Sequence, residues 1–345
     1  MGITDEVRRR LAAFPIPLEP KRLSWHEGKL TLSLELGFPF EASKKRLIEA
    51  LQAIPGVSEV ELSLSWMVEA KAVPPPKRPL PGIKNLIAIA SGKGGVGKST
   101  VAVNAALALQ LEGAKVGLLD ADIYGPSIPK MLGIDGQPQV KERQKIVPKE
   151  AYGVKLMSIG FLIEEETPMI WRGPMATSAL RQLLQQTDWG ELDYLIVDLP
   201  PGTGDIHLTL VQNAPLAGGV IVTTPQEIAL IDAMKGLKMF EKVNVPLLGI
   251  VENMGFYRCR KCGQREALFG EGGGERLARK FGVPLLGSLP IDPDVVYALD
   301  RGRPPTVSDP ESETARAFST VALRMAAELA KRPKDRSLKI GIEVE

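Results

Sequence analysis

The stretch "SGKGGVGKST", residues 91–100, decides the fold. It contains the complete P-loop pattern Gly-x-x-x-x-Gly-Lys-Ser, and it stands between an apolar run typical of a strand and a stretch with helical spacing. Glycines in such a turn let backbone N–H groups point at phosphate oxygens, and the start of the helix adds partial positive charge. A chance Gly-rich turn would not be expected to have this placement. The stretch therefore predicts a nucleotide-phosphate site.

Single positions in this loop have separate expected roles. We expect Lys98 to reach the β- and γ-phosphates of ATP and Ser99 to bind Mg²⁺. Lys93 is an additional lysine, which cannot easily share phosphates that Lys98 already holds; it could serve a nucleotide across a dimer interface, and the alternative is a solvated loop lysine. The predicted nucleotide-binding residues of the loop are Gly92, Lys93, Gly94, Gly95, Val96, Gly97, Lys98, Ser99 and Thr100.

Aspartates follow two of the expected strands. Asp120 and Asp122 stand in "LLDADIYGPS", and Asp198 stands in "LIVDLPPGTGD". An aspartate at the tip of a buried strand is costly unless it meets a cation or a water network. We expect Asp198 to hold Mg²⁺ through water and Asp122 to orient the attacking water, whereas Asp120 could simply cap a turn. With Lys93 and Lys98, Asp122 and Asp198 form the predicted catalytic set.

The loop after Asp198 has the composition of a switch segment. In "PPGTGD", residues 200–205, the N–H of Gly202 could sense the γ-phosphate of the nucleotide. His207 follows this loop. We expect it to pack or to lie at the surface, because phosphoryl transfer depends mainly on positioning and electrostatics.

The rest of the large segment alternates apolar runs with helical patterns. Near-continuous apolar runs are typical of strands buried on both faces of a parallel sheet. The sequence thus predicts an α/β fold, a doubly wound and mainly parallel sheet of the P-loop NTPase kind, with ligands at the carboxyl ends of the strands. The expected strands are 86–91, 115–120, 155–160, 194–199, 219–224, 246–253 and 283–290.

A proline-rich stretch, "VPPPKRPLPG" at residues 73–82, marks a stiff linker. Before it, the order helix, strand, helix, strand predicts a small α+β unit. The expected organisation is a small α+β domain over residues 1–72, a linker over 73–84, a P-loop NTPase domain over 85–330, and a loosely held tail over 331–345.

Composition excludes several classes of protein. Among 345 residues, 44% are hydrophobic and 24% charged, and the net charge is +2, which gives no support to nucleic-acid or anionic-membrane binding. The charged start of the chain argues against secretion, and no apolar run is long enough to span a membrane. Two cysteines exclude a disulfide framework. We therefore expect a cytoplasmic protein with no nucleic-acid and no membrane partner.

The two cysteines, Cys259 and Cys262, stand together in "FYRCRKCGQRE", residues 256–266. A C-x-x-C pair is a common metal-binding pattern, but two thiolates do not complete a tetrahedral site. Four neighbouring cations would be expected to lower the thiol pKa values: Arg258, Arg260, Lys261 and Arg265. A thioredoxin-like redox pair is disfavoured, because the motif is expected to follow a strand and an irregular stretch.

Taken together, the motifs closely resemble the Mrp/ApbC family. The resemblance rests on "KGGVGKST", "DADIYGPSIP", "WRGPM", "DLPPGTGDIHLTL", the segment 223–254, the C-x-x-C and "FGEGGGERLA", and covers roughly residues 84–330. That family consists of iron–sulfur cluster carrier ATPases of the deviant Walker A class, related to MinD, ParA and the nitrogenase iron protein. The first segment resembles the small iron–sulfur-assembly domain of many members, but it lacks the cysteine that this domain often carries.

The resemblance implies further roles. Lys93 would be the signature lysine that crosses a homodimer, and Asn253 would contact the adenine base. Cys259 and Cys262 would bind a [4Fe-4S] cluster shared by two subunits, for transfer to apo iron–sulfur proteins. The stretch around Pro290 and Asp292 would line the base pocket.

Ligand count agrees with a shared site but does not identify the metal. A [4Fe-4S] cluster usually needs four thiolates, and two chains related by a two-fold axis supply four. A shared Cys₄ zinc site has the same needs and stays an alternative. The leading hypothesis is thus an ATP-hydrolysing cluster carrier. The alternatives are a MinD/ParA-like positioning ATPase with a structural zinc, and an electron-transfer protein, which is disfavoured because the nitrogenase iron protein takes its cysteines from two separate elements.

Overall fold

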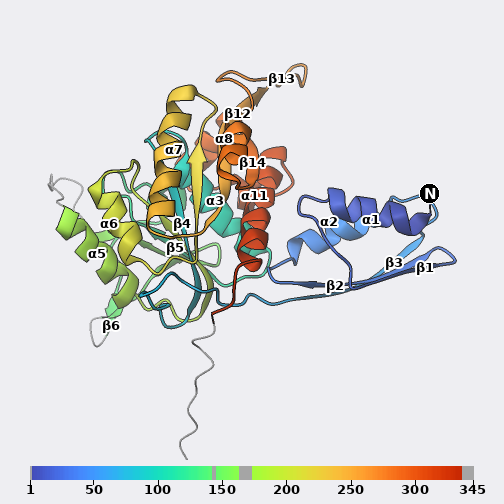
Figure 1. Ribbon diagram of the computed structural model, residues 1–345, viewed down its shortest axis with the longest axis horizontal. Helices are drawn as coiled ribbons and strands as arrows, with labels where there is room; N and C mark the ends of the chain where they lie inside the picture. The colour runs from blue at the N-terminus through green and yellow to red at the C-terminus, as the bar shows by residue number, and fades with distance from the viewer. Residues whose placement is uncertain (1, 142–144, 163–172, 336–345) are drawn as a thin grey trace, which may run out of the picture.

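The computed structural model describes residues 2–141, 145–162 and 173–335. Figure 1 shows a layered α/β body and a smaller unit, built from the first part of the chain, that projects from one side. Two expectations fall outside the described residues: Trp171 and Arg172 of the "WRGPM" motif, and residues 336–345 of the expected tail.

The body is organised around a nine-stranded sheet with the order β13-β12-β11-β4-β10-β5-β9-β8, in which β14 also pairs with β12. The short strands β8 (Lys149–Ala151) and β13 (Arg265–Glu266) are antiparallel to their neighbours. The other seven are parallel and correspond to the seven expected strands: β4 (Ile83–Ser91), β5 (Val116–Asp120), β9 (Val154–Ser158), β10 (Leu192–Asp198), β11 (Gly218–Thr223), β12 (Leu247–Arg258) and β14 (Leu285–Ile291). The predicted fold class is confirmed.

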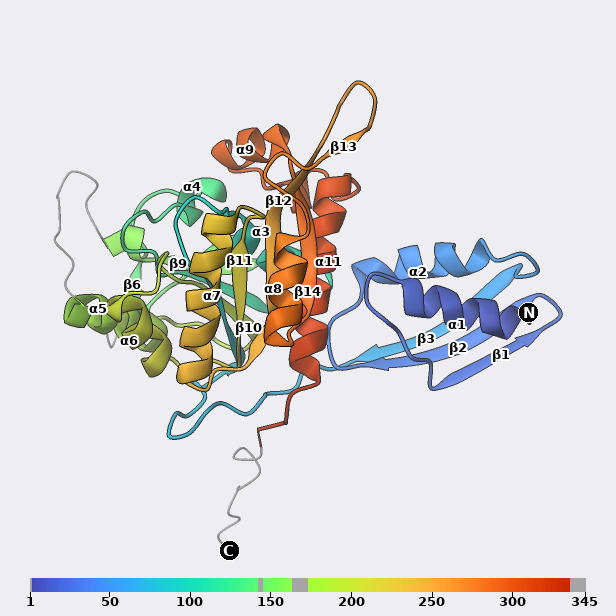
Figure 2. The ribbon, with the colours of Figure 1, turned by 45° about the horizontal axis from the view of Figure 1, so that its top comes forward.

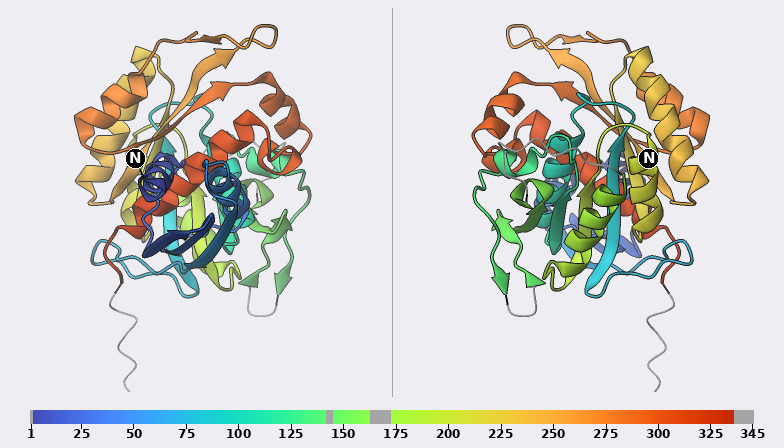
Figure 3. Two further views of the ribbon diagram at one scale, coloured as in Figure 1. Left: turned by 90° about the vertical axis from the view of Figure 1, so that its right-hand side faces the viewer. Right: turned by 90° about the vertical axis from the view of Figure 1, so that its left-hand side faces the viewer.

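Helices cover both faces of this sheet, which buries its central strands completely (Figure 3). One face carries α3 (Lys98–Leu111) and α11 (Glu313–Ala330), which pack on each other. The other carries α5 (Gly173–Gln186), α6 (Asp205–Asn213), α7 (Glu227–Lys242) and α8 (Gly273–Phe281). The remaining elements of the body are short: α4 (Ile128–Met131), β6 (Val140–Lys141), β7 (Lys145–Ile146), η2 (Ile159–Leu162), α9 (Pro293–Asp300) and α10 (Pro305–Ser308).

Helix α3 follows the P-loop and is apolar on nearly all sides. Ten of its fourteen residues are buried. A helix of this kind must lie inside a protein, because it has no polar face to present to water. It lies between the sheet and α11, so the P-loop at its first turn is anchored to the centre of the body.

The small unit consists of two helices on one face of a three-stranded sheet (Figure 2). Its elements are α1 (Ile3–Ala13), β1 (Arg22–His26), β2 (Lys29–Leu36), α2 (Ala42–Gln52) and β3 (Glu59–Trp66). Strand β2 alternates as expected, with Leu30, Leu32 and Leu34 buried. Strand β1 was not predicted, because it is an edge strand whose residues, His26 included, are mostly exposed and carry no alternating pattern.

The end of the chain returns to the segment that joins the two parts. Lys71 forms a β-bridge with Lys334, and Ala72 N donates to Pro333 O at 2.9 Å. The Lys71 ammonium donates to Ala330 O at 2.8 Å. The expectation of a loose tail is therefore wrong for residues 331–335, because the backbone of the joining segment pairs with them.

The small unit also contacts the far ends of α3 and α11. Glu112, directly after α3, is buried, and its carboxylate accepts from Ser43 N at 3.0 Å and from Ser43 Oγ. Arg324 of α11 donates from Nε to Pro15 O at 2.7 Å. The helix that begins at the P-loop thus ends against the small unit.

Candidate functional site

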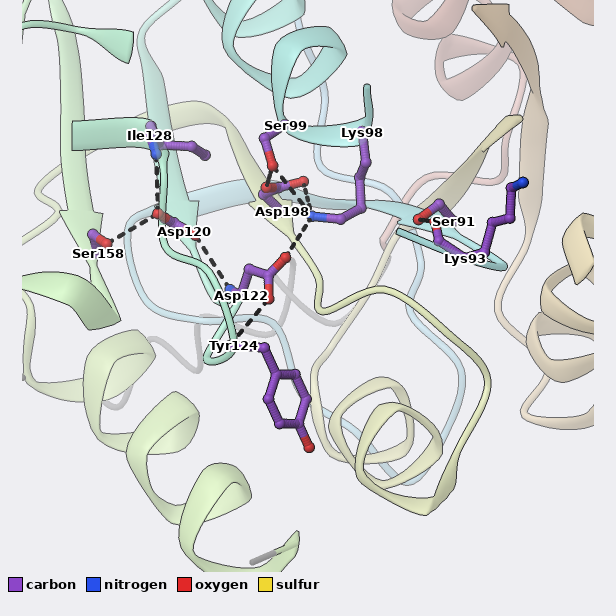
Figure 4. Close-up of polar contacts among 10 residues, drawn as sticks. All are labelled: Ser91, Lys93, Lys98, Ser99, Asp120, Asp122, Tyr124, Ile128, Ser158 and Asp198. Carbon is purple, nitrogen blue, oxygen red and sulfur yellow. Dashed lines mark hydrogen bonds and ion pairs between the residues drawn. The ribbon is translucent and has the colours of Figure 1, made fainter. Parts of the chain in front are cut away.

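The carboxyl ends of β4, β5 and β10 bring the phosphate loop and the aspartates together. Strand β10 lies between β4 and β5, and Asp198 stands beside Asp120 in the register. Lys98 is 6% exposed, and its Nζ lies 2.8 Å from Asp198 Oδ1 and 3.4 Å from Asp122 Oδ2 (Figure 4). Four of the predicted residues, Lys98, Ser99, Asp122 and Asp198, therefore converge on one point.

Burial and charge act in opposite directions on this cluster. Burial lowers the pKa of Lys98, but Asp198 and Asp122 raise it more, so the net shift of the Lys98 pKa is upward. Burial raises the pKa of Asp198 above its ordinary value, against the opposing effect of Lys98. The ammonium is the cation that lets a fully buried carboxylate exist at this strand end.

Ser99 and Asp198 are adjacent and present hard oxygen atoms. Ser99 Oγ donates to Asp198 Oδ2 at 2.5 Å, and Lys98 Nζ lies 3.4 Å from Ser99 Oγ. A hydroxyl and a carboxylate beside a phosphate loop are ligands that suit Mg²⁺. The residues present fit the expected ion, with Lys98 supplying positive charge at the same carboxylate.

Asp122 and Asp120 have different surroundings. Asp122 lines the cavity of the phosphate loop, and its Oδ1 accepts from Tyr124 N at 3.2 Å. Asp120 is fully buried, and burial, then Asp198, raise its pKa to about 7. Its oxygens accept from Asp122 N, Ile128 N and Ser158 Oγ at 3.0–3.2 Å. Asp120 therefore caps the turn that positions Asp122. This is the turn-capping role that the sequence offered for Asp120.

Lys93 does not join this cluster. Its side chain extends away from Lys98 and the carboxylates, and its backbone oxygen accepts from Ser91 Oγ at 2.9 Å (Figure 4). The loop is held close to α7 at the preceding residue, because a Cβ on Gly92 would lie 2.1 Å from the backbone of Asp232. The role of Lys93 across a dimer stays a prediction.

Asn253 contacts the phosphate loop directly. It lies in β12, and its Nδ2 donates to Val96 O at 2.9 Å. Gly97 has a φ of 82° and leaves room for this contact, since a Cβ there would lie 2.1 Å from Asn253 Nδ2. Sequence analysis missed this contact, and the implied contact of Asn253 with adenine stays a prediction.

Six of the nine predicted loop residues line a cavity of about 200 Å³, whereas Gly92, Lys93 and Val96 do not. Its walls are Ser91, Gly94, Gly95, Gly97, Lys98, Ser99, Thr100, Asp122, Ser127, Met131 and Pro201. A larger hollow of about 1190 Å³ lies beneath the proline-rich segment and contains none of the predicted site residues. The smaller cavity is therefore the candidate site, because predicted site residues line it and line no part of the larger hollow.

The two cysteines lie in a hairpin that projects beyond the body (Figures 1 and 2). Strand β12 continues to Arg258 and pairs with β13, so the residues directly before Cys259 are strand and not an irregular stretch. The irregularity of this segment is a register shift against β14 between Glu252 and Phe256, where Met254 has a φ of 56°. Cys259 N donates to Gln264 O at 2.9 Å, and Gly263 N donates to Cys259 O at 2.8 Å. Both thiols are free; Cys259 is half-buried and Cys262 exposed.

The arginines around the cysteines are engaged elsewhere. Arg258 and Arg265 both pair with Glu313 at the start of α11, and Arg260 pairs with Asp294 at 2.8 Å. The pKa of the Cys259 thiol is lowered, but by the backbone N–H groups of residues 262 and 261 and by the neighbouring thiol. The expected effect of the cations is thus wrong for the three arginines, because nearby carboxylates compete for them.

Asp292 has a structural role at the base of this hairpin. Its Oδ1 accepts from Asp294 N at 3.0 Å and caps α9, and its Oδ2 accepts from Thr314 Oγ1 at 2.8 Å. Pro290 pairs with Phe256 in the sheet. These contacts tie the hairpin to α9 and α11, and the lining of a base pocket by this stretch stays a prediction.

Within residues 2–141, 145–162 and 173–335, no three histidine, cysteine, aspartate or glutamate side chains gather to hold a metal ion. The hairpin of one chain offers two thiolates. In the same ranges, no helix is long and apolar enough to cross a membrane.

Comparison with known proteins decides the family. A sequence profile described as ParA: NUBPL iron-transfer P-loop NTPase matches residues 82–326, well over half of the chain. The chain belongs to this family. The Mrp/ApbC resemblance is confirmed with it, and this NUBPL-type NTPase has the sheet and P-loop that its sequence predicted.

Its relatives cover most of its length. The iron-sulfur cluster carrier protein of Haemophilus influenzae is 49% identical over 310 residues, 88% of this chain and 84% of that protein. The mouse iron-sulfur cluster transfer protein NUBPL is 48% identical over 262 residues, 75% of this chain and 82% of its own length.

Solved structures agree on the fold. A nucleotide-binding protein from Archaeoglobus fulgidus, in complex with ADP, is 42% identical with a TM-score of 0.59, covering 69% of this chain and 93% of that chain. MinD of Pyrococcus furiosus has a TM-score of 0.53 at 23% identity, covering 70% of this chain and 98% of its own. The likeness to MinD is one of fold alone.

Proposed function

We propose that this NUBPL-type NTPase is a cytoplasmic, ATP-hydrolysing carrier that holds a [4Fe-4S] cluster between two copies of the chain and transfers it to apo-proteins. One observation carries the proposal. The strand that contacts the phosphate loop through Asn253 continues, past an irregularity at Met254, to the hairpin that presents Cys259 and Cys262. A single strand thus joins the candidate nucleotide site to a pair of free thiols.

At the nucleotide site, the residues of the chain would act mainly by positioning ATP and by neutralising its charge. ATP would exchange the ion pairs of Lys98 with Asp198 and Asp122 for contacts to its β- and γ-phosphates. Ser99 and Asp198 would hold Mg²⁺, which supplies neutralisation of the phosphate charge. Asp122, released from Lys98, would orient the attacking water.

A second copy of the chain is needed for both halves of the mechanism. Lys93 points away from the cluster of its own chain, which supports a role at a nucleotide held by the partner. Each hairpin supplies two thiolates, and two hairpins related by a two-fold axis supply the four that a cluster needs.

The hairpin favours a cluster as cargo over a zinc ion as a structural support. Its turn is closed by backbone hydrogen bonds, and its base is held by ion pairs of Arg258, Arg260 and Arg265. A structural zinc site contributes its binding energy to folding, whereas this turn has its own supports. The exposed thiol of Cys262 also suits cargo that must be passed on.

Anaerobic reconstitution with iron and sulfide tests this proposal. We expect about four iron atoms and four sulfides per two chains, measured by metal analysis together with the visible absorbance of the cluster. Stoichiometric zinc on protein that takes up no cluster would contradict the carrier function and favour the positioning ATPase. Addition of ATP and an apo-protein acceptor then tests transfer.

A further inference from the structure

His207 is a buried imidazole whose function is not explained by packing alone. It lies in the first turn of α6, directly after the loop formed by residues 199–204, and it is 3% exposed. Neither ring nitrogen makes a hydrogen bond within the part of the chain that the structure describes. The expectation that His207 packs or lies at the surface missed this combination of burial and unpaired polar atoms.

Such a group is unfavourable for the free protein. Nearly all buried polar groups in folded proteins have a hydrogen-bond partner. A group without one loses its hydrogen bonds to water on folding and gains none in the protein, which lowers the free energy of unfolding. Burial, and then the charge of Lys98, lower the pKa of His207 to about 4, so the ring is neutral near pH 7. A neutral ring carries one N–H donor and one acceptor nitrogen, both available.

The backbone of the 199–204 loop is close to this ring. The backbone groups of Pro200 and Gly202 lie near enough to oppose the downward shift of the His207 pKa, although neither ring nitrogen makes a hydrogen bond to them within the described residues. Gly202 has a φ of 102°, and its N donates to Ser91 O at 3.0 Å, at the start of the phosphate loop.

The same loop forms one wall of the nucleotide cavity. Pro201 lines the cavity of about 200 Å³ together with Lys98 and Ser99. A Cβ built on Gly202 or on Gly204 would meet no atom within 4 Å, so open space lies beside these two residues of the loop.

We propose that His207 is a positioning residue for ATP hydrolysis, whose ring N–H donates to a backbone carbonyl of residues 200–202 once the loop closes on the γ-phosphate. This inference rests on the proposed hydrolysis of ATP. The ring N–H is unpaired in the open arrangement and gains an acceptor in the closed one, so it favours closure when the nucleotide is bound. His207 thereby acts through the loop and not on the reacting atoms.

The test compares His207→Leu with His207→Gln. Leucine has a similar volume but no polar atoms, whereas the glutamine amide retains one donor and one acceptor. We expect His207→Leu to lower kcat for ATP about tenfold, in line with the loss of one hydrogen bond, to leave KM nearly unchanged, and to raise Tm without nucleotide by about 2–4 °C. His207→Gln should recover most of kcat.

Thr187→Val is the matched control. Thr187 is buried with an unpaired Oγ1, outside the nucleotide cavity, so its replacement should also raise Tm but leave kcat unchanged. An unchanged kcat in His207→Leu overturns the inference, as does a lower Tm or an insoluble protein, since either would show that the ring supports the free fold. Absence of hydrolysis by the wild type overturns the proposed function itself and this inference with it.

Discussion

The phosphate loop and the cysteine hairpin are built in opposite ways. The phosphate site is buried at the centre of the sheet, and one chain supplies its lysine, hydroxyl and carboxylates. The hairpin projects from the body, and one chain supplies two thiolates held in place by exposed ion pairs. The difference agrees with the proposed function, in which the buried site would hold a nucleotide and the exposed hairpin would pass a cluster to another protein.

Lys98→Ala should have the largest effect, because it removes the cation from the buried cluster. ATP hydrolysis should fall by about 100-fold or more, and the free energy of unfolding by about 3 kcal/mol, since Asp198 is left buried without its partner. Denaturant titration and a phosphate-release assay measure the two effects. Iron content after reconstitution should stay that of the wild type.

Lys84→Ala is the control for this variant. Lys84 is half exposed and pairs with Asp193 at 2.7 Å on the same sheet, so its loss should cost less than about 1 kcal/mol. Equal losses of stability in the two variants would contradict the contrast between a buried and an exposed site.

Cys259→Ala should abolish cluster loading and leave ATP binding intact. Cys262→Ala should behave in the same way, because each residue supplies one of two thiolates per chain. Iron content and nucleotide titration measure the two properties. Wild-type iron content in either variant would show that the ligands lie elsewhere.

Glu313→Gln should have a smaller effect, confined to the hairpin. It weakens the ion pairs with Arg258 and Arg265, which are exposed, so the free energy of unfolding should fall by at most about 1 kcal/mol. The hairpin becomes less restrained, and a chelator should remove iron from it faster. Glu311→Gln is the matched control, since Glu311 pairs with Arg316 away from the hairpin; an equally fast loss of iron there would contradict the proposed restraint.

The smallest effect is a contrast in pH dependence between two glutamates. Burial raises the pKa of Glu112, so the folded state holds this proton more tightly than the unfolded state, and the carboxylate costs stability as pH rises above about 4.5. Arg258 lowers the pKa of Glu313, so its stabilisation is present above about 4.5 and is lost as pH falls below that value. Unfolding from pH 3 to 7 should show opposite pH trends for Glu112→Gln and Glu313→Gln relative to the wild type. Trends of the same sign would contradict this assignment.

The phosphate site was predictable because its information is local. The loop pattern lies within ten residues, and the carboxyl ends of parallel strands meet at one edge, so Lys98, Ser99 and Asp198 were expected to converge. The fold class followed from the same buried strands. Strand and helix patterns could not predict where the Lys93 side chain lies, because its expected partner is a nucleotide bound to a second chain.

The supports of the hairpin were not predictable from sequence. Arg258 and Glu313 lie 55 residues apart, and Asn253 and Val96 lie 157 apart. A charged residue in a motif can pair with any carboxylate that the fold brings near, so its proximity in sequence to a cysteine was misleading. The unpaired ring of His207 likewise depends on packing that periodicity cannot reveal.

Mixing wild-type protein with a Cys259→Ala/Cys262→Ala variant tests the central claim most directly. Equal amounts are mixed, allowed to exchange subunits, and reconstituted with iron and sulfide. If two copies share one cluster, only pairs of wild-type chains hold it, and the iron content falls to about one quarter of that of pure wild type. An iron content of about one half would show that each chain holds its metal alone and would contradict the shared site.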